Sequence, residues 1–395
     1  MAKPTLALIP ASQGPLVYSV LPSDGSGDFS FSRGSSATRI NSQGLIENVA
    51  SGQSRLDYPL IDGVVNGCPS LLLEPERTNL VTYSEDFSNA SWAKAASTIT
   101  SNIITSPDGT LNASLFQSNV TDGYMYPPSS ILSSAANGTF TYSIYAKEGN
   151  TSSFTILMTG GANYVGNFNL TTVVATTSSA NTTVDISNVG NGWYRCSLIA
   201  SLVPSSAYSE LQIGRISSGS NLYLFGAQLE EGSYATSYIP NYGTIAGVTR
   251  SAETANGSGD ATTFSDSEGV LMAEISGFKN DSNYRTISVS DGTSANRVNI
   301  WIWNDGRLRT DLTSASVQQA GVFLNYDITS STKIALKYKL NDFSVWVNGI
   351  EVYTFSISNT PISLNNISFY EGSVLYPFYG KTKQIQYFKT ALTDS

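Results

Sequence analysis

The sequence contains no histidine. This absence excludes the catalytic systems in which a histidine activates a serine or cysteine nucleophile, and it excludes every metal site built on imidazole ligands. The sequence therefore favours a protein that works by presenting a surface rather than by reacting.

Charge is also scarce. Only 13% of the 395 residues are charged, about half of the roughly 25% that is usual in globular chains. Ser, Thr, Asn and Gly take their place, which suits β-structure and turns and is poor for surface helices. The net charge is −9 and no basic stripe is present, so we expect no nucleic-acid partner. The 22 Tyr, 16 Phe and five Trp argue against disorder.

Cysteines and long apolar runs are nearly missing. The two cysteines, Cys68 and Cys196, lie far apart in sequence and exclude a disulfide framework, although a single bridge stays open. We expect two buried free thiols in a protein assembled in a reducing cytoplasm. No stretch is long enough to span a bilayer, and the N-terminus lacks a signal-peptide core, so we expect neither membrane insertion nor the secretory route.

Short strands separated by turns fill most of the chain. In residues 78–240, "FTYSIYAKEG" places every second side chain on one face: Phe140, Tyr142, Ile144 and Ala146. In residues 263–395, Asn348-Gly349 predicts a tight two-residue hairpin turn. This spacing is typical of sandwiches or jelly rolls rather than of alternating βα units. The predicted fold is all-β, with two β-sandwich (jelly-roll) domains in series behind a small N-terminal anchoring segment.

The parts outside these two runs differ in character. Residues 1–77 alternate short apolar runs with Gly-rich turns and form either a small β-subdomain or an arm that docks on a larger body. The stretch "CPSLLLEPER" marks the seam, with a short buried strand at Leu71–Leu73 that Pro75 ends. Residues 241–262 are small and polar, as expected of a linker or a docking strap.

The first quarter of the chain carries a recognisable combination of motifs. "FSRGSSATRINSQGLIE" followed by "LLLEPERTNLVTYSEDFSNASWAK" resembles the N-terminal part of bacteriophage virion proteins, such as head fibres, tail fibres and minor structural proteins. The resemblance implies attachment to a virion through this segment, either to the capsid or to the tail.

Two further resemblances concern the sandwiches. "TNLVTYSEDF" paired with "LYLFGAQLEEGSYATSYIP" is similar to the opening and closing strands of a carbohydrate-binding-module-like jelly roll. "EGVLMAEIS", "KIALKYKLNDFSVWVNGIEV" and "GKTKQIQYFKTALTD" resemble strands of laminin-G-like, concanavalin-type sandwiches. Those folds often bind sugars, some of them with calcium.

Sugar sites of this kind use an exposed aromatic ring together with Asn, Asp or Arg side chains. Trp346 is opposite the apolar face of its strand and close to Asn348, so we select both as ligand candidates. Trp301 and Trp303 share the face opposite Val298, Ile300 and Ile302. Two exposed tryptophans there would form a stacking platform or a subunit contact. For Trp346 the alternative is packing inside the second sheet or in a subunit contact.

The N-terminal segment offers candidates for anchoring, and the last domain offers weak ones for calcium. The anchoring candidates are Arg33, Arg39, Glu74 and Arg77, with solvated loop charges as the alternative reading. We expect Arg77 to pair with Glu74 or Glu76. Asp281, Asp291 and Asp305 lie in loops, but no ligand loop has recognisable calcium spacing. We therefore predict no metal site and no cofactor.

Together these observations predict a non-enzymatic bacteriophage structural protein, displayed on the virion as a head fibre, capsid decoration or tail fibre after assembly in the host cytoplasm. Its expected partners are other virion proteins, further copies of itself in a homotrimer or other homo-oligomer, and glycans of the host or of mucus. The first alternative is a spacer or decoration protein with no ligand. The second is a polysaccharide depolymerase, for which the neighbouring pairs Glu74/Glu76 and Glu230/Glu231 give little support because they span no groove.

Overall fold

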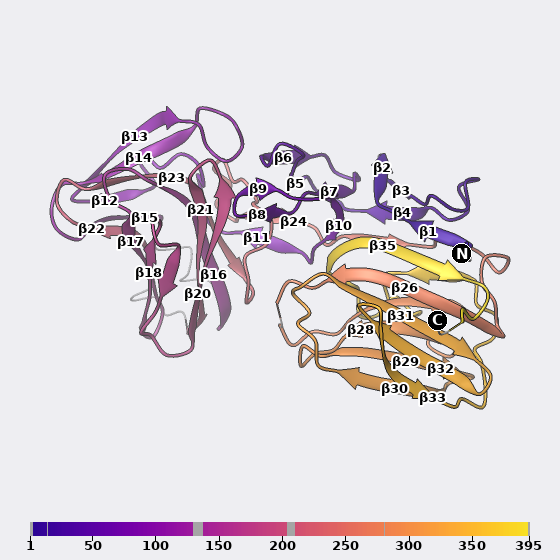
Figure 1. Ribbon diagram of the computed structural model, residues 1–395. Helices are drawn as coiled ribbons and strands as arrows, with labels where there is room; N and C mark the ends of the chain where they lie inside the picture. Colours follow the sequence, from indigo (N-terminus) through magenta and orange to yellow (C-terminus); the bar gives the residue numbers. More distant parts are fainter. Residues whose placement is uncertain (1–2, 14, 129–136, 204–209, 280, 394–395) are drawn as a thin grey trace.

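The computed structural model describes residues 3–13, 15–128, 137–203, 210–279 and 281–393. In these residues every regular element is a β-strand, so the all-β prediction is confirmed. The described chain contains no helix that is long and apolar enough to cross a membrane. Figure 1 shows two lobes, with the N-terminal strands lying along the side that connects them.

The first lobe is a sandwich of two antiparallel sheets. As predicted, Phe140, Tyr142, Ile144 and Ala146 all face its core. Within the described residues, one six-stranded sheet has the order β12 (Ala93–Ala95), β15 (Gly123–Tyr126), β22 (Leu211–Ile216), β17 (Ser153–Thr159), β18 (Asn163–Asn169), β19 (Val174–Thr176). The other has the order β13 (Ser97–Ile104), β14 (Ala113–Ser118), β23 (Asn221–Glu231), β16 (Gly138–Glu148), β21 (Trp193–Leu202), β20 (Thr182–Gly190).

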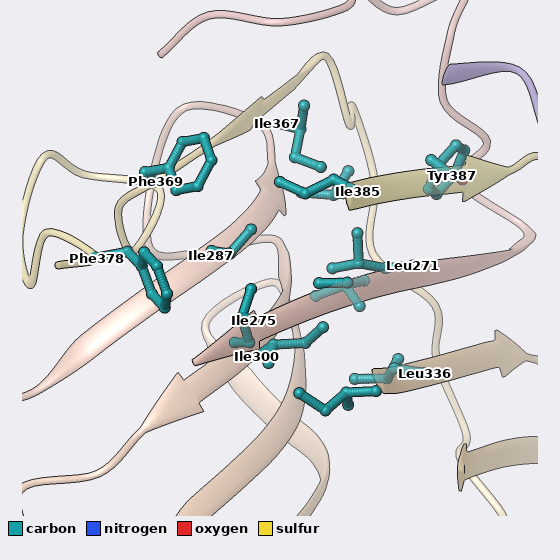
Figure 2. Close-up of a cluster of buried hydrophobic side chains, with 14 of the residues drawn as sticks. Leu271, Ile275, Ile287, Ile300, Leu336, Ile367, Phe369, Phe378, Ile385 and Tyr387 are labelled. Atoms are coloured by element: carbon teal, nitrogen blue, oxygen red, sulfur yellow. The ribbon is translucent and has the colours of Figure 1, made fainter. Parts of the chain in front are cut away.

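The second lobe is a sandwich of an eight-stranded and a five-stranded sheet, counted over the described chain. Buried aliphatic and aromatic side chains from both sheets meet between them, as Figure 2 shows for Leu271, Ile300 and Ile385. The larger sheet has the order β33 (Ile350–Phe355), β32 (Asp342–Val347), β31 (Thr332–Lys339), β26 (Glu268–Ser276), β35 (Gly380–Phe388), β10 (Ser70–Leu73), β7 (Arg55–Asp57), and β1 (Leu6–Leu8) also pairs with β35. The smaller has the order β30 (Val317–Leu324), β29 (Leu308–Ser314), β28 (Arg297–Ile302), β27 (Arg285–Ser290), β34 (Asn366–Ser368).

The N-terminal segment is built into the second lobe. Strand β10 pairs with β35 in the register Leu71↔Thr382, and β1 pairs with β35 in the register Leu6↔Tyr387. Leu71 and Leu73 belong to the same core as the C-terminal strands, which confirms the short buried strand expected at the seam. Segments from the two ends of the chain therefore complete one sheet.

The other N-terminal strands form small sheets with each other and with residues 241–262. Strand β25 extends the sheet of β2, β3 and β4, and β24 pairs with β11, so this polar stretch acts as a strap rather than as a free linker. The strands are β2 (Ala11–Gln13), β3 (Leu16–Tyr18), β4 (Phe29–Ser32), β25 (Thr254–Asn256), β5 (Ala37–Ile40), β6 (Ile46–Val49), β8 (Leu60–Ile61), β9 (Val64–Val65), β11 (Arg77–Asn79) and β24 (Val248–Arg250).

The N-terminal segment also docks on the first lobe. Ile46 packs against a separate cluster on the outside of that sandwich, which contains Tyr145 and the buried Trp193. Nearby, the hairpin turn at Gly63 approaches Gly190 so closely that a Cβ on Gly63 would lie 2.6 Å from the Gly190 nitrogen. The segment thus touches both lobes and fixes one relative to the other.

Two local predictions have opposite outcomes. Asn348 and Gly349 connect β32 to β33 with positive φ angles of 52° and 84°, which confirms the tight hairpin turn. The stretch "YSEDFSNASW" predicts a single helical turn, because Ser84 suits an N-cap and Glu85 and Asp86 suit the first turn. This prediction is wrong. Residues 83–92 form successive turns instead, because the side chains of Asp86 and Asn89 accept hydrogen bonds from the backbone two residues on.

Candidate functional site

The tryptophans of β28 alternate with its core face as predicted. Ile300 and Ile302 point into the core, and Trp301 points to the outer side of the five-stranded sheet. The expectation that Trp301 is exposed is wrong, since only 4% of it is accessible. Its ring is covered by Tyr376, at 5.7 Å between ring centroids, and its indole N–H donates to Asp311 at 2.9 Å.

A loop that sequence periodicity could not place explains this burial. Residues 370–377 fold back over the outer side of β27: the backbone N–H of Thr286 donates to the Tyr376 carbonyl at 3.1 Å, and the Ser288 hydroxyl donates to the Tyr370 carbonyl at 2.6 Å. The loop therefore covers Trp301 and the part of β27 beside it.

Next to the loop lies a cluster of rings around Trp303, which we call the aromatic face and define as Tyr284, Trp303, Phe323 and Tyr376 with Arg307 and Arg309. Tyr284 and Phe323 meet the Trp303 ring edge-on, at centroid distances of 4.5 and 5.3 Å. Phe323 is 42% and Tyr376 is 41% exposed. The face therefore offers partly exposed rings in rigid mutual contact.

Two guanidinium groups lie against these rings. Arg307 lies 4.3 Å from the Phe323 centroid and Arg309 lies 4.4 Å from the Trp303 centroid, which are favourable cation–π distances. Arg307 donates twice to Asp305, at 2.8 and 2.6 Å, and Arg309 donates to Gln318 at 2.6 Å. Both arginines are thus held in place by hydrogen bonds, with 43% of the Arg307 side chain and 15% of the Arg309 side chain exposed.

A buried acid lies beneath the aromatic face. Asp311 accepts from the Asn299 amide at 2.8 Å and pairs with Arg309 at 3.2 Å. Burial raises the pKa of Asp311, and the lowering by Arg309 does not cancel that effect. Through its bonds to Trp301 and Arg309, Asp311 fixes the orientation of both side chains.

This combination suits a ligand with hydroxyl groups and apolar C–H faces, because rings can stack on the latter while guanidinium N–H groups bond the former. The sequence analysis selected Trp303 but missed Tyr284, Phe323, Tyr376, Arg307 and Arg309. The two arginines could have been found, since the Asp305-Gly306 hairpin predicts a register that places Arg309 opposite Trp301. Phe323 and Tyr376 arrive from other elements and leave no such signal.

Trp346 and Asn348 lie on the other side of the sandwich. Val345 and Val347 face the core as predicted, and Trp346 is half-buried on the outer side of the eight-stranded sheet, 5.4 Å from the Lys337 ammonium. The side chain of Asn348 accepts the Lys333 backbone N–H at 3.0 Å, so it supports its turn. The structure therefore does not bring Trp346 and Trp303 into one site.

The anchoring candidates divide into two groups. Arg33 and Glu74 are each only 2% exposed, so neither is the surface charge expected from the sequence. Arg39 is partly exposed and pairs with Glu47 at 2.9 Å. Arg77 lies 3.8 Å from Glu230, so the expected pairing with Glu74 or Glu76 is wrong. Arg39 and Arg77 remain accessible at the surface.

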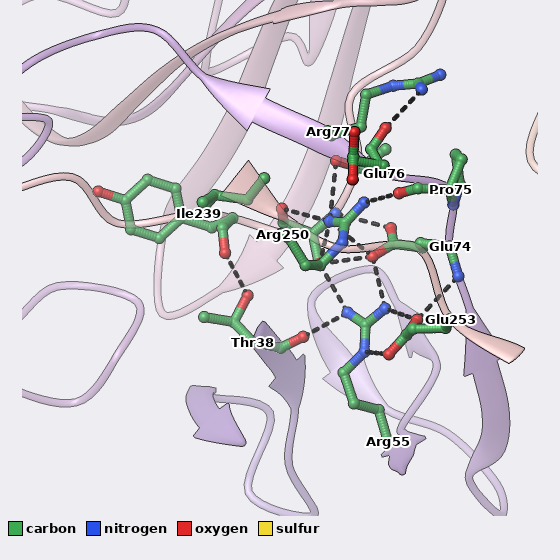
Figure 3. A network of polar contacts seen from close by, with 12 residues as sticks. Thr38, Arg55, Glu74, Pro75, Glu76, Arg77, Ile239, Arg250 and Glu253 are labelled. Carbon is green, nitrogen blue, oxygen red and sulfur yellow. Dashed lines mark hydrogen bonds and ion pairs between the residues drawn. The ribbon is translucent and has the colours of Figure 1, made fainter. Parts of the chain in front are cut away.

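Arg33 and Glu74 belong to a buried ionic network, which Figure 3 shows in part, and which we define as Arg33, Arg55, Glu74, Arg250 and Glu253. Glu253 of the strap accepts from Arg33 at 2.6 Å, from Arg55 at 2.8 Å and from the Glu74 backbone N–H at 2.9 Å. It therefore binds the strap to three places on the N-terminal segment.

Glu74 connects the same network to the first lobe. Its carboxylate pairs with Arg55 at 2.8 Å and with Arg250 at 2.9 Å, and it accepts from the Ser237 backbone N–H at 2.8 Å. Burial alone would raise the pKa of Glu74, but Arg250 and Arg55 outweigh it and hold the pKa well below its ordinary value. The charges that mark the seam in the sequence thus join three segments of the chain.

Each acid that was considered as a calcium ligand contacts a different partner within the protein. Asp281 pairs with Arg285, Asp305 pairs with Arg307, and Asp291 accepts from Thr293 and Asn296. Within the described ranges no group of three or more acidic or thiol side chains is arranged to hold a metal ion.

Both cysteines are free thiols in this structure. Cys196 is buried in the first core as expected, and burial raises its pKa. Cys68 is exposed, contrary to the expectation, because it lies in the irregular segment between β9 and β10 rather than within a strand.

Comparisons with known proteins give only distant likenesses. No protein-family model matches the chain. No curated protein matches it either. Among solved structures, the CBM40 module of the Ruminococcus gnavus IT-sialidase, bound to α2,3-sialyllactose, is 19% identical over 35% of this chain and 89% of its own, with a TM-score of 0.30.

Two others have similar scores. Domain 4 of a GH43 extracellular arabinanase from Geobacillus stearothermophilus, in complex with arabinotriose, is 13% identical over 36% of this chain and 69% of its own, with a TM-score of 0.30. Domains LG4-5 of the mouse laminin α1 chain are 8% identical over 86% of this chain and 96% of their own, with a TM-score of 0.26. Scores this low assign neither a family nor a ligand to this chain.

Proposed function

We propose that this protein is a non-catalytic glycan-binding protein and that its aromatic face is the binding surface. The observation that carries the proposal is the contiguity of partly exposed rings and fixed guanidinium groups around Trp303. Rings and hydrogen-bond donors in one rigid patch are what stacking on a sugar requires.

The surroundings of the carboxylates support binding without catalysis. The acids weighed for a depolymerase include Glu74 and Glu230, and both are buried and bonded within the protein. Glu230 accepts from the Gln228 amide at 2.6 Å and from the Thr236 hydroxyl at 2.6 Å. A general acid or nucleophile must instead reach its substrate across a groove.

The sequence resemblance of the first quarter of the chain supports a place on a bacteriophage particle. In this proposal the protein is a head fibre, capsid decoration or tail fibre that is exposed on the virion and meets other virion proteins through the N-terminal segment. Arg39 and Arg77 are the accessible anchoring candidates. Assembly as a homo-oligomer, with many copies per particle, would turn weak single sites into firm attachment to host or mucus glycans.

The test is a glycan array probed with the full chain, because strands β1, β7 and β10 are shared with the C-terminal sandwich and the isolated module would lose them. The variants are Phe323→Ala and Trp303→Ala on the aromatic face. Phe355→Ala is the matched control, since Phe355 is 50% exposed on the other sheet. Trp346→Ala tests the second tryptophan surface predicted from the sequence.

We expect reproducible glycan hits, and we expect the affinity for these glycans to fall about tenfold or more in Phe323→Ala and Trp303→Ala. A tenfold loss corresponds to the roughly 1.4 kcal/mol of one stacked ring. Phe355→Ala should bind as wild type does. Hits lost only in Trp346→Ala would move the site to the opposite sheet and refute the aromatic face. An array without hits would favour the spacer or decoration role, and release of reducing ends from host polysaccharide would refute the absence of catalysis.

A further inference from the structure

A cleft of about 600 Å³ lies where the two lobes and the N-terminal segment meet. One wall is the outer side of β20 and β21, with Asp185 and Arg195. The N-terminal segment contributes Arg39 and Asp57, and the second lobe contributes Phe278 and Lys279. Ligand sites of 300–1,000 Å³ occur preferentially at such domain interfaces. No part of this cleft belongs to the aromatic face.

Most charges along the cleft are neutralised within the protein, but two cations are not. Arg39 pairs with Glu47, and Lys381 pairs with Asp57 at 2.8 Å. Among the described residues, no carboxylate lies within ion-pair distance of Arg195 or Lys279, and no cation lies within ion-pair distance of Asp185, which also lines the cleft. The unpaired groups of the cleft therefore carry one net positive charge, in a chain whose net charge is −9.

Arg195 is held rigidly in this wall. Its guanidinium donates to the Thr236 carbonyl at 2.6 Å and to the Ser143 hydroxyl at 3.0 Å, and it lies 5.3 Å from the Tyr145 ring centroid. A fixed cation costs a ligand little ordering entropy. The acid that faces the same space is Asp185, which is exposed and accepts from the Ser187 hydroxyl at 3.0 Å.

The junction between the lobes supplies an aromatic wall. Tyr234 of the first lobe stacks on Phe278 of the second, at a centroid distance of 5.3 Å and an interplanar angle of 23°. Both residues line the cleft, so this ring pair offers an apolar surface beside the cations.

We propose that this cleft is a second binding site, for an oligosaccharide that carries carboxylate groups. The unpaired cations select an anion, the stacked ring pair selects a sugar, and the volume admits more than one sugar ring. Because its walls come from both lobes, a bound ligand also holds the lobes together. This site is independent of the aromatic face, and either can fail without the other.

The experiment titrates the full chain by calorimetry with three probes: trigalacturonate, the neutral trimer of galactose, and acetate. Lys279→Glu is the main variant. Lys333→Glu makes the same charge change at an exposed position outside the cleft, and Asp185→Asn removes the opposing acid without a change of shape. Thermal unfolding of each variant verifies that it is folded.

We expect trigalacturonate to bind, the two other probes to bind at least tenfold more weakly, and the melting temperature to rise with trigalacturonate. Lys279→Glu should weaken trigalacturonate about tenfold or more, as loss of a charged contact does, while Asp185→Asn should strengthen it and Lys333→Glu should leave it unchanged. No binding at millimolar trigalacturonate would overturn the proposal. So would equal losses in the two lysine variants, or equal binding of acetate, which would mean a simple anion site.

Discussion

Replacing Glu253 by Gln should release the strap from the N-terminal segment. Glu253 is completely buried, and its carboxylate accepts from Arg33, from Arg55 and from the Glu74 backbone N–H. Gln has the same shape but no charge, and its NH₂ group would face guanidinium donors. The variant therefore leaves three buried arginines with Glu74 as the one remaining acid of the ionic network.

The magnitude follows from the burial of this network. Removing one partner of a buried ion pair costs about 3–5 kcal/mol, because the other charge stays buried without compensation. That is a large share of the roughly 5–15 kcal/mol that stabilises a typical domain. Glu47→Gln is the matched control, because it removes an acid from an exposed ion pair. The side chains of Arg39 and Glu47 are 27% and 42% exposed, and exposed pairs contribute about 0–1 kcal/mol.

Amide hydrogen exchange measures this effect locally, which matters because a chain with two lobes need not unfold in one step. We expect the amides of β24 and β25 to lose about two to three orders of magnitude of protection in Glu253→Gln, since 1.4 kcal/mol is about tenfold. Protection in Glu47→Gln should match wild type. Equal protection of the strap in both variants would refute the idea that the buried network fixes it.

Three further predictions concern pH and docking. Burial raises the pKa of Glu85 to about 6, so the wild type should lose stability relative to Glu85→Gln as pH rises from about 4.5 to 6, and parallel melting curves over that window would contradict this. The depressed pKa of Glu74 has the opposite sign: its stabilising contribution is complete above the ordinary value of 4.5 and is lost as pH falls further. Melting followed by circular dichroism should therefore show that the stability advantage of wild type over Glu74→Gln shrinks as the pH falls below about 4.5, and an advantage that stays constant would contradict this. In urea titrations, Gly63→Ala should lower the free energy of unfolding by about 1–3 kcal/mol more than Gly52→Ala does. Both glycines have positive φ, but only Gly63 lies against Gly190. Equal losses in the two variants would mean that the hairpin does not depend on this contact.

The period of two within each strand was readable without coordinates. Apolar residues occupy every second position from Phe140 to Ala146 and from Val298 to Ile302, and these residues face the cores in the structure. The reason is that successive side chains of a strand point to opposite sides of the sheet. The Asn-Gly turn at Asn348 was readable for the same local reason, since only a few residue types accept positive φ. Such features depend on neighbours in the chain and on nothing farther away.

Contacts between segments far apart in the chain leave no periodic signal. Three contacts join segments that sequence spacing does not relate. Strand β1 pairs with β35, Arg33 and Arg55 pair with Glu253, and Tyr376 covers Trp301. Composition and alternation determined that this chain makes β-sandwiches without histidine chemistry. Only the tertiary structure decided which charges are buried, which rings are exposed and where the lobes enclose a cleft, because burial is set by what packs on a residue from elsewhere in the chain.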